Sequence, residues 1–300
     1  MKAVQFSEYG DPDVLHVVVA DEPHAGPGQV RIKVAAAGVN GMDWKIRAGY
    51  LKDMMPVTFP AGLGLDASGV VDEVGAGVDD VKVGDAVFGS GRATYAEYAV
   101  LNFWATKPEA LSFAEAAGYP IPVETAIRIL DQVGVQAGQT LLVSGASGGV
   151  GSAVLQIARD RGITVIGTAG AANQDYVRAL GATPTTYGDG LVERVRALAP
   201  NGIDAALDIA GSGVIADLIE LTGDPSKVLS IADFAAPEQG AQVSTDSVNQ
   251  NAAFADAARL ADAGELSIPV QQSFPLERAA QAHALSAAGH VVGRLVLTTA

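Results

Sequence analysis

One segment near the middle of the chain, TLLVSGASGGVGSAVLQIARDRG (residues 140–162), restricts the possible folds more than any other feature. An apolar run leads directly into a cluster of small residues, and that cluster leads directly into a helical pattern. Gly148 and Gly151, with Ala146 at the first position, match a variant of the dinucleotide fingerprint. Small residues there let the backbone approach a pyrophosphate, and the helix N-terminus turns its free N–H groups toward the phosphates. The candidate phosphate-binding residues are Ser147, Gly148, Gly149, Val150 and Gly151.

Strand and helix patterns alternate regularly after this loop. Such alternation favours a parallel, doubly wound sheet, that is, a Rossmann arrangement. The strand-like runs are TVIGTAG, TPTTY, IDAALDIAG and KVLSIAD, and the helix-like runs between them are QDYVRALG, GLVERVRALAP and SGVIADLIEL.

The same glycine letters also occur in the loop of short-chain dehydrogenases, which is an alternative reading. Two facts oppose it. Short-chain enzymes usually begin with this loop, whereas here the loop follows Ser144. They also need a Tyr and a Lys four residues apart, and no tyrosine of this chain has a Lys at that distance.

The two ends of the chain differ in character from its middle. Short strand-like runs separated by Gly, Pro and Asp turns dominate the first 117 residues, and the tail ends in the strand-like run VVGRLVLTT. The closing strand is expected to rejoin the first domain. We therefore predict an α/β chain with a β-rich domain over 1–117 plus 267–300 and an inserted nucleotide-binding domain over 118–266.

The turn after the second strand of the nucleotide-binding region bears on the choice of nucleotide. An acidic residue about 20 residues after the loop usually binds the ribose 2′-hydroxyl of NAD. Residues 168–174 read TAGAANQ, and the first carboxylate is Asp175. A small turn without an acid leaves room for a 2′-phosphate, and the sequence thus predicts NADPH. Further candidate cofactor-binding residues are Thr168, Gly170, Arg178 and Tyr187, with Ala210 and Ile231 in the later strand-like runs.

Composition and charge narrow the possible sites and partners. The absence of cysteine removes disulfides, thiolate catalysis and thiolate zinc sites, and the four scattered histidines are expected to be structural or solvent-exposed. A net charge of −15 without a Lys/Arg-rich run disfavours nucleic acid. No apolar run approaches the roughly 20 residues of a membrane helix, and the N-terminus has no signal pattern. A cytoplasmic protein without a membrane partner is expected.

Five segments spread over the chain form a second signature: AAAGVNGMDWKIRAGY, PAGLGLDASGVVDEVGAGV, VGDAVFG, SGASGGVGS and FPLERAAQAHALSAAGHVVGRLVL. Together they resemble the medium-chain dehydrogenase/reductase superfamily, specifically its zinc-free quinone oxidoreductase branch. The resemblance covers essentially the whole chain. It implies a GroES-like catalytic domain with an inserted Rossmann domain and a cleft between them.

Departures from the zinc-dependent members of that superfamily define the expected chemistry. Those members carry a Cys after the AAAGV stretch and a His-Glu pair in the later glycine-rich segment. Here the two regions read GVNGMD (38–43) and GLD (64–66), so the metal cage cannot be assembled. The resemblance then implies direct hydride transfer to an electron-poor π-system.

The resemblance also suggests catalytic candidates. It places Asn40 and Asp43 at the floor of the cleft near the nicotinamide. Asn40 could donate a hydrogen bond to a carbonyl oxygen that gains negative charge, whereas Asp43 is equally well a turn-former. Tyr50 is the best equivalent of a tyrosine that relatives place near the acceptor. Asp66 is expected to hold the cleft loop rather than do chemistry.

The leading functional prediction is an NADPH-dependent, zinc-independent reductase of a quinone or an α,β-unsaturated carbonyl compound. Two alternatives stay open: an enoyl-thioester or biosynthetic ene reductase of the same fold, and a non-catalytic NADPH-binding protein. The expected partners are a small quinone or enone substrate and a second copy of the chain in a homodimer.

Overall fold

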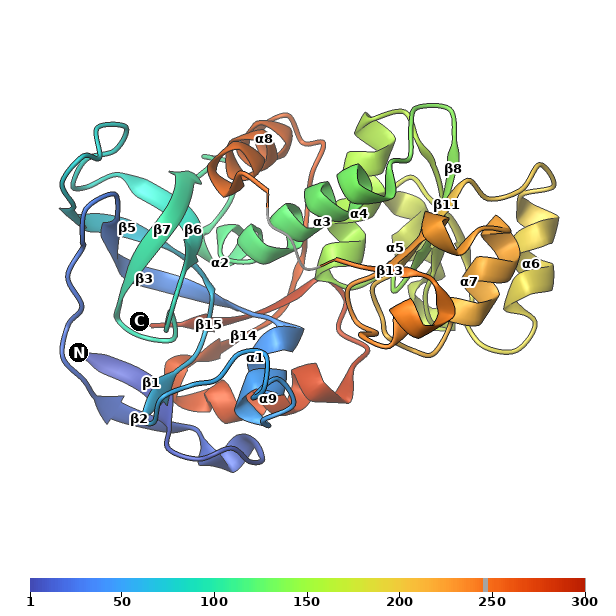
Figure 1. Ribbon diagram of the computed structural model, residues 1–300. Helices are drawn as coiled ribbons and strands as arrows, with labels where there is room; N and C mark the ends of the chain where they lie inside the picture. The colour runs from blue at the N-terminus through green and yellow to red at the C-terminus, as the bar shows by residue number, and fades with distance from the viewer. Residues whose placement is uncertain (245–247, 300) are drawn as a thin grey trace. The chain divides into compact units, whose positions relative to one another are not determined.

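The computed structural model describes residues 1–244 and 248–299. The chain divides into two compact units, each with helices and strands, which confirms the expected α/β class (Figure 1). The first unit comprises Met1–Ile121, Asn249–Gly264 and Ile268–Ala300, and the second comprises Pro122–Val248 and Glu265–Ser267.

A six-stranded sheet in the order β14-β15-β3-β5-β6-β7 forms the centre of the first unit. β7 also pairs with β3, so the sheet curls back on itself as a small barrel. The closing strand β15 (red in Figure 1) runs antiparallel to β3 (blue). The strands are β3 (Val30–Val39), β5 (Asp66–Val74), β6 (Ala86–Gly91), β7 (Tyr98–Thr106), β14 (Val270–Pro275) and β15 (Arg294–Thr298).

Strand β3 shows why these residues form a half-buried barrel wall. Val30, Ile32 and Val34 are buried, whereas Arg31 and Lys33 between them are not. This alternation sends β-branched side chains into the barrel core and charged ones outward.

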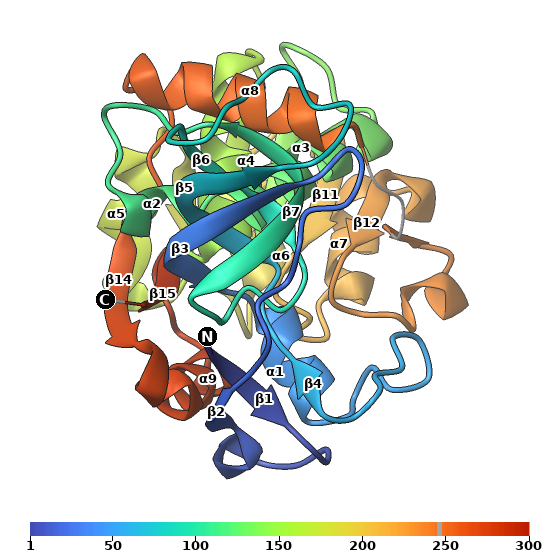
Figure 2. The same cartoon turned by 90° about the vertical axis from the view of Figure 1, so that its left-hand side faces the viewer.

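The remaining elements of the first unit surround the barrel. A smaller sheet has the order β2-β1-β4, visible at the lower edge of Figure 2. Three short helices connect or cover the strands. The elements are β1 (Lys2–Phe6), β2 (His16–Val19), β4 (Ala61–Gly62), α1 (Gly41–Arg47), α2 (Phe113–Ala116) and α9 (Ala279–Ala288).

Helix α8 (Gln250–Asp262) lies in the first unit, although the sequence placed it in the nucleotide-binding domain. The side chain of Asn251 accepts a hydrogen bond from the backbone N–H of Trp104 on β7 (3.0 Å). The rings of Phe254 and Phe88 pack with centroids 5.9 Å apart. Figure 2 shows α8 over β6 and β7. These contacts join α8 to strands that are remote in sequence, so the local pattern of α8 does not predict them.

The second unit is built on a parallel sheet with the order β10-β9-β8-β11-β12-β13. Counted from β8, this is the strand order 3-2-1-4-5-6 of a doubly wound dinucleotide-binding fold, so the predicted Rossmann arrangement is confirmed. Strands and helices alternate along the chain as the sequence predicted. The strands are β8 (Thr140–Ser144), β9 (Thr164–Thr168), β10 (Thr183–Thr185), β11 (Ala205–Asp208), β12 (Val228–Ser230) and β13 (Gln242–Val243). The helices are α3 (Pro120–Val133), which begins in the first unit, α4 (Gly149–Asp160), α5 (Gln174–Ala179), α6 (Leu191–Leu198) and α7 (Ile215–Thr222).

None of the helices in the described parts of the chain is long and apolar enough to cross a membrane.

Candidate functional site

The glycine turn between β8 and α4 is the centre of the candidate nucleotide site. Gly145 has φ +88°, a conformation that favours glycine, and it turns the chain away from the strand. Gly148 is the N-cap of α4 and makes no side-chain cap hydrogen bond. The first N–H groups of a helix have no partner within the helix, so those of α4 are available to an anion.

Two glycines of this turn have different structural roles. A β-carbon on Gly151 would lie 2.2 Å from the Gly145 carbonyl oxygen, so Gly151 allows the helix to pack against the turn. A β-carbon on Gly148 would meet only the Gly145 oxygen, at 3.9 Å. Gly148 thus leaves space open in front of the helix N-terminus. Ser147, Gly149 and Val150 are half-exposed along the same turn.

Other predicted cofactor residues converge on the glycine turn from neighbouring strands. The Thr168 hydroxyl, at the end of β9, accepts a hydrogen bond from the Gly145 N–H (3.4 Å). A β-carbon on Gly145 would lie 3.2 Å from the Ala210 β-carbon, so Ala210 borders the turn. Ile231 follows β12 and is half-buried. All of these residues lie at the carboxyl edge of the parallel sheet, where such folds bind their ligands.

A buried polar pair that the sequence did not identify supports two of these loops. The Ser230 hydroxyl donates to Asp208 Oδ2 (2.9 Å), and the Gly211 N–H donates to Asp208 Oδ1 (3.0 Å). Ala210 lies next to Gly211, and Ile231 lies next to Ser230. The detectable signal was a polar residue at the end of each apolar strand, Asp208 after AAL and Ser230 after VL.

The turn after β9 brings Gly170 and Tyr187 together. A β-carbon on Gly170 would lie 3.7 Å from the Tyr187 hydroxyl, and the Tyr187 side chain is exposed. The Gln174 amide donates to the carbonyl of Ala169 (2.8 Å) and so fixes this turn. The predicted partner Arg178 is exposed and forms an ion pair with Asp175, which offsets its charge.

The loop that carries Tyr187 is held by a guanidinium group. Arg194 donates to the backbone carbonyls of Thr186, Gly188 and Asp189. This role leaves no signal in the sequence, because a cluster of backbone carbonyls can be formed by any residue types.

In the first unit, Asn40 and Asp43 are in direct contact. Asn40 follows β3 directly and is the N-cap of α1, with 4% of its surface exposed. The Asp43 carboxylate accepts hydrogen bonds from the Asn40 backbone N–H and from the Tyr95 hydroxyl, both at 2.7 Å. Burial raises the pKa of Asp43 to about 6, although these two bonds favour its charged form. The turn-forming role that the sequence left open for Asp43 is present in the structure.

The amide of Asn40 reaches a second buried carboxylate. Asn40 Nδ2 donates to Asp66 Oδ2 (3.0 Å), and Arg294 donates to the same oxygen (2.9 Å). The other oxygen, Oδ1, accepts from the Ile121 N–H (3.1 Å). Burial raises the pKa of Asp66 to about 7, and the charge of Arg294 opposes that shift.

Tyr50 is separate from this network. Its side chain is exposed, at 73%, and its ring meets the half-buried Trp44 edge-on with centroids 5.7 Å apart. Tyr50 therefore offers an aromatic surface to solvent, whereas Asn40 and Asp43 belong to the buried network.

A buried histidine packs against Tyr95. His283 on α9 packs edge-on against the Tyr95 ring (centroids 5.7 Å, 80°). Neither ring nitrogen has a hydrogen-bond partner among the described residues. Burial and, secondarily, the positive charge of Arg47 lower the pKa of His283 to about 3. The imidazole is therefore neutral at physiological pH.

The donors near Asn40 do not fit a zinc site. Within residues 1–244 and 248–299, no group of three or more His, Cys, Asp or Glu side chains is placed to hold a metal ion. Asp43 already accepts hydrogen bonds from Asn40 and Tyr95. Asp66 already accepts one from Asn40 and forms an ion pair with Arg294, whose positive charge opposes a metal cation. No step proposed below uses a metal.

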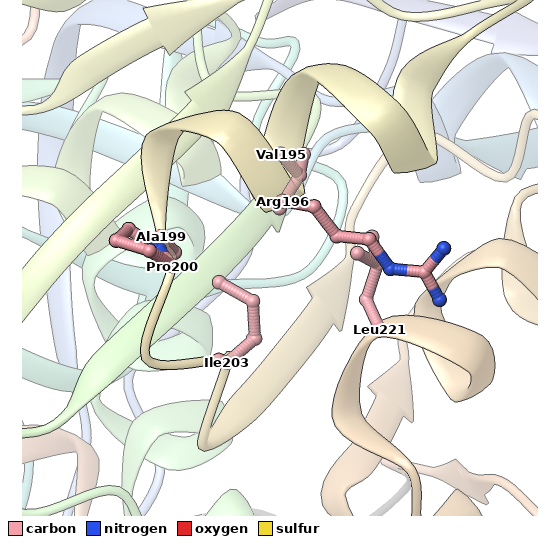
Figure 3. A pocket seen from close by; sticks show the side chains of 7 residues that line it. Val195, Arg196, Ala199, Pro200, Ile203 and Leu221 are labelled. Atoms are coloured by element: carbon pink, nitrogen blue, oxygen red, sulfur yellow. The ribbon is translucent and has the colours of Figure 1, made fainter.

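The second unit also has a surface pocket of about 330 Å³ that contains none of the predicted site residues. It lies between α6, the following loop and α7, and the Arg196 side chain that lines it runs past Leu221 (Figure 3). Arg196 pairs with Glu220 (2.8 Å). The lining residues are Val195, Arg196, Ala199, Pro200, Gly202, Ile203 and Leu221.

Comparison with known proteins bears on this geometry. Residues 26–115 match the family model of the alcohol dehydrogenase GroES-like domain, and residues 180–297 match that of the zinc-binding dehydrogenases. Quinone oxidoreductase of Sus scrofa is 31% identical over an alignment of 310 positions, which covers 94% of this chain and 93% of that protein. Three further curated relatives, 35 to 42% identical, are matched over only 53 to 59% of their own length.

Two of the similar solved structures align with this chain over the full length of both chains. An NAD-dependent alcohol dehydrogenase is 31% identical with a TM-score of 0.87. A mycobacterial protein complexed with NADPH is 25% identical with a TM-score of 0.86. The GroES-like and Rossmann parts inferred from the residues thus occur together in known proteins of this length.

Proposed function

Because the chain belongs to the medium-chain dehydrogenase/reductase superfamily, in its quinone-oxidoreductase-like branch, we propose that it is an NADPH-dependent, zinc-independent oxidoreductase that transfers hydride to a quinone or an α,β-unsaturated carbonyl compound. One observation carries the proposal: the N-terminus of α4 has no capping side chain, and the space beside Gly148 is open. A pyrophosphate fits both features. The mycobacterial relative that holds NADPH supports the same role.

The preference for NADPH rests on the turn after β9. No carboxylate precedes Asp175 in this turn, and the Tyr187 hydroxyl lies near Gly170, where it can donate to a 2′-phosphate. Tyr187 is a better candidate than Arg178, whose charge is offset by Asp175. Since one relative is NAD-dependent, the relative affinity for the two nucleotides is the decisive measurement.

Asn40 is the residue that we assign to the acceptor. The bound nucleotide supplies a hydride from its reduced nicotinamide. Asn40 Nδ2 carries two hydrogens, and Asp66 takes one of them. We assign the other to the acceptor oxygen, on which negative charge develops. A donor of this kind is typically worth about 3 kcal/mol, and less for a strongly electrophilic quinone. Solvent or a side-chain hydroxyl supplies the proton, so the acceptor gains two electrons and two hydrogens in all.

Asp43 and Tyr50 have subordinate roles in this proposal. Asp43 holds the backbone of Asn40 at the start of α1 and therefore positions it. Tyr50 presents an exposed ring that can stack on a conjugated acceptor.

The direct test is a substrate panel. We expect NADPH oxidation with simple quinones and with enones, and we expect turnover to persist after dialysis against EDTA because the donor set does not fit zinc. Stopped assays with NADPH and NADH would cover quinones, enones and enoyl thioesters. A clear preference for enoyl thioesters would instead support an ene reductase, and nucleotide binding without any turnover would support a non-catalytic protein. Activity that is lost on chelation and restored by zinc would contradict the proposal.

A single substitution tests the nucleotide preference. Ala171 is exposed at the start of the turn after β9, so Ala171→Asp should be tolerated by the fold. A carboxylate there repels the 2′-phosphate, and we expect the ratio of NADPH to NADH dissociation constants to rise about tenfold. Ala179→Asp, which makes the same change on the exposed end of α5, is the control and should leave the ratio unchanged. An unaltered ratio in Ala171→Asp would place the 2′-phosphate elsewhere.

The homodimer and the cytoplasmic location remain predictions from the sequence.

A further inference from the structure

The network around Asp66 is more specific than a structural core requires. Asp66 is fully buried, and it accepts hydrogen bonds from Asn40, Arg294 and the backbone of Ile121. Arg294 is also buried and lies on β15, 228 positions away in the sequence. A buried ion pair contributes little net stability on average because desolvation opposes the attraction. The pair therefore invites a role beyond stability.

Two glycines make room for this pair. A β-carbon on Gly38 would lie 2.8 Å from the terminal nitrogen of Arg294 that contacts Asp66, and 3.0 Å from the Asp66 β-carbon. A β-carbon on Gly118 would lie 3.1 Å from the Arg294 side chain. The backbone is thus shaped around the guanidinium group on two sides.

The charge state of Asp66 determines which way the Asn40 amide can face. An ionised carboxylate only accepts hydrogen bonds, so Asn40 must present Nδ2 to it. A protonated carboxyl group can also donate, and it would then equally accommodate the amide oxygen of Asn40. Only the first arrangement reliably leaves the second N–H of Asn40 for an acceptor.

We propose that Asp66 and Arg294 are positioning residues: Arg294 keeps Asp66 ionised, and ionised Asp66 orients the Asn40 amide so that an N–H meets the oxygen of the reduced acceptor. The inference rests on the proposed function, because it assigns Asn40 to that oxygen. Neither Asp66 nor Arg294 touches the substrate.

The groups that face Asp66 set the pH at which this orientation is lost. They are Arg294 from β15, Asp43 from α1, the Asn40 amide and the Ile121 N–H at the start of α3. Burial raises the pKa of Asp66 to about 7, the nearby Asp43 adds to that rise, and Arg294 opposes it. Asp66 is ionised above that pKa and protonated below it. Turnover should accordingly fall as the pH decreases through about 7.

A double-mutant cycle tests the inference. The variants are Asn40→Ala, Asp66→Asn and the double variant, assayed with NADPH and a quinone. Asp72→Asn is the matched control, since Asp72 lies on the same strand β5 and also pairs with an arginine, Arg31 (2.9 Å). We expect Asn40→Ala and Asp66→Asn each to lower kcat about tenfold with little change in KM, and the double variant to lose no more than either single one. The control should keep the activity of the natural protein.

The pH profile provides the second readout. The kcat of the natural protein should fall as the pH drops through about 7. In Asp66→Asn the fall near pH 7 should be absent because residue 66 no longer titrates, and any remaining fall should lie at or below pH about 6, where Asp43 titrates. Arg294→Lys keeps the positive charge but loses the planar fork of the guanidinium group. It should therefore raise the pH at which kcat falls, while retaining activity above that pH. If Asp66→Asn does not fold, the pH at which kcat falls in Arg294→Lys tests the positioning role instead.

The possible outcomes distinguish a failure of the positioning role from a failure of the proposed function. Two results would overturn the positioning role and leave the proposed function intact. One is a kcat in the double variant that falls by the product of the two single losses, and the other is a fall of kcat near pH 7 that persists in Asp66→Asn. Normal turnover of Asn40→Ala with both quinones and enones would instead remove Asn40 from the reaction, and the inference would fall with it.

Discussion

Replacing Gly148 with valine is expected to weaken NADPH binding about 100-fold while the fold persists. The φ of Gly148 is −76°, which valine adopts readily, and the nearest described atom beyond its two chain neighbours would lie 3.9 Å from a β-carbon there, at the Gly145 oxygen. The side chain would instead fill the space in front of the α4 N-terminus, where a phosphate must come close to the N–H groups. Loss of two hydrogen bonds to a charged phosphate weakens binding by about 3 kcal/mol, or about 100-fold. Fluorescence titration with NADPH measures this effect.

Gly151→Val is the informative comparison for that experiment. Its β-carbon would lie 2.2 Å from the Gly145 oxygen and 2.7 Å from the Ala146 backbone, so the helix must move away from the turn. We expect Gly151→Val to lose about 3 kcal/mol of unfolding free energy, whereas Gly148→Val should melt near the natural protein. A folded Gly148→Val with unchanged NADPH affinity would show that the phosphates bind elsewhere.

The second large effect concerns stability in acid. The unfolded chain protonates His283 near pH 6.5, whereas the folded protein does so only near pH 3 because the ring is buried beside Arg47. Between these values the unfolded state binds more protons, so the stability contributed above pH 6.5 is lost progressively as the pH falls. At pH 5 the loss is about 2 kcal/mol. Leucine does not titrate and leaves no unpartnered ring nitrogen.

Urea unfolding of the natural protein and of His283→Leu at pH 7.5 and pH 5 measures this contribution. The unfolding free energy of His283→Leu relative to the natural protein should rise by about 2 kcal/mol from the higher to the lower pH. His16→Leu is the control, because His16 is exposed on β2 and the same substitution there should follow the natural protein at both values. A difference for His283→Leu that is independent of pH would mean that the ring titrates normally in the folded state.

The local patterns of the sequence were sufficient for the order of elements and for the glycine turn. Helical and alternating periodicities, punctuated by glycines, predicted β8, α4 and the parallel strands that follow, because each pattern reports one buried face of one element. The adjacency of Asn40 and Asp43 was also local, since both lie at the start of one short helix. The roles proposed for these residues in binding and catalysis remain to be tested by the variants above.

The sequence by itself determined the strand–glycine–helix unit, the alternation of strands and helices after it and the absence of thiolate chemistry, because these depend on residue types at short spacing. Tertiary structure alone decided that α8 packs on β7, that Arg294 meets Asp66 and that His283 is buried with no hydrogen-bond partner among the described residues. The physical reason is the same in each case. Burial, amide orientation and protonation depend on the desolvation and the charges that remote segments bring to a side chain, and no local pattern records which segments those will be.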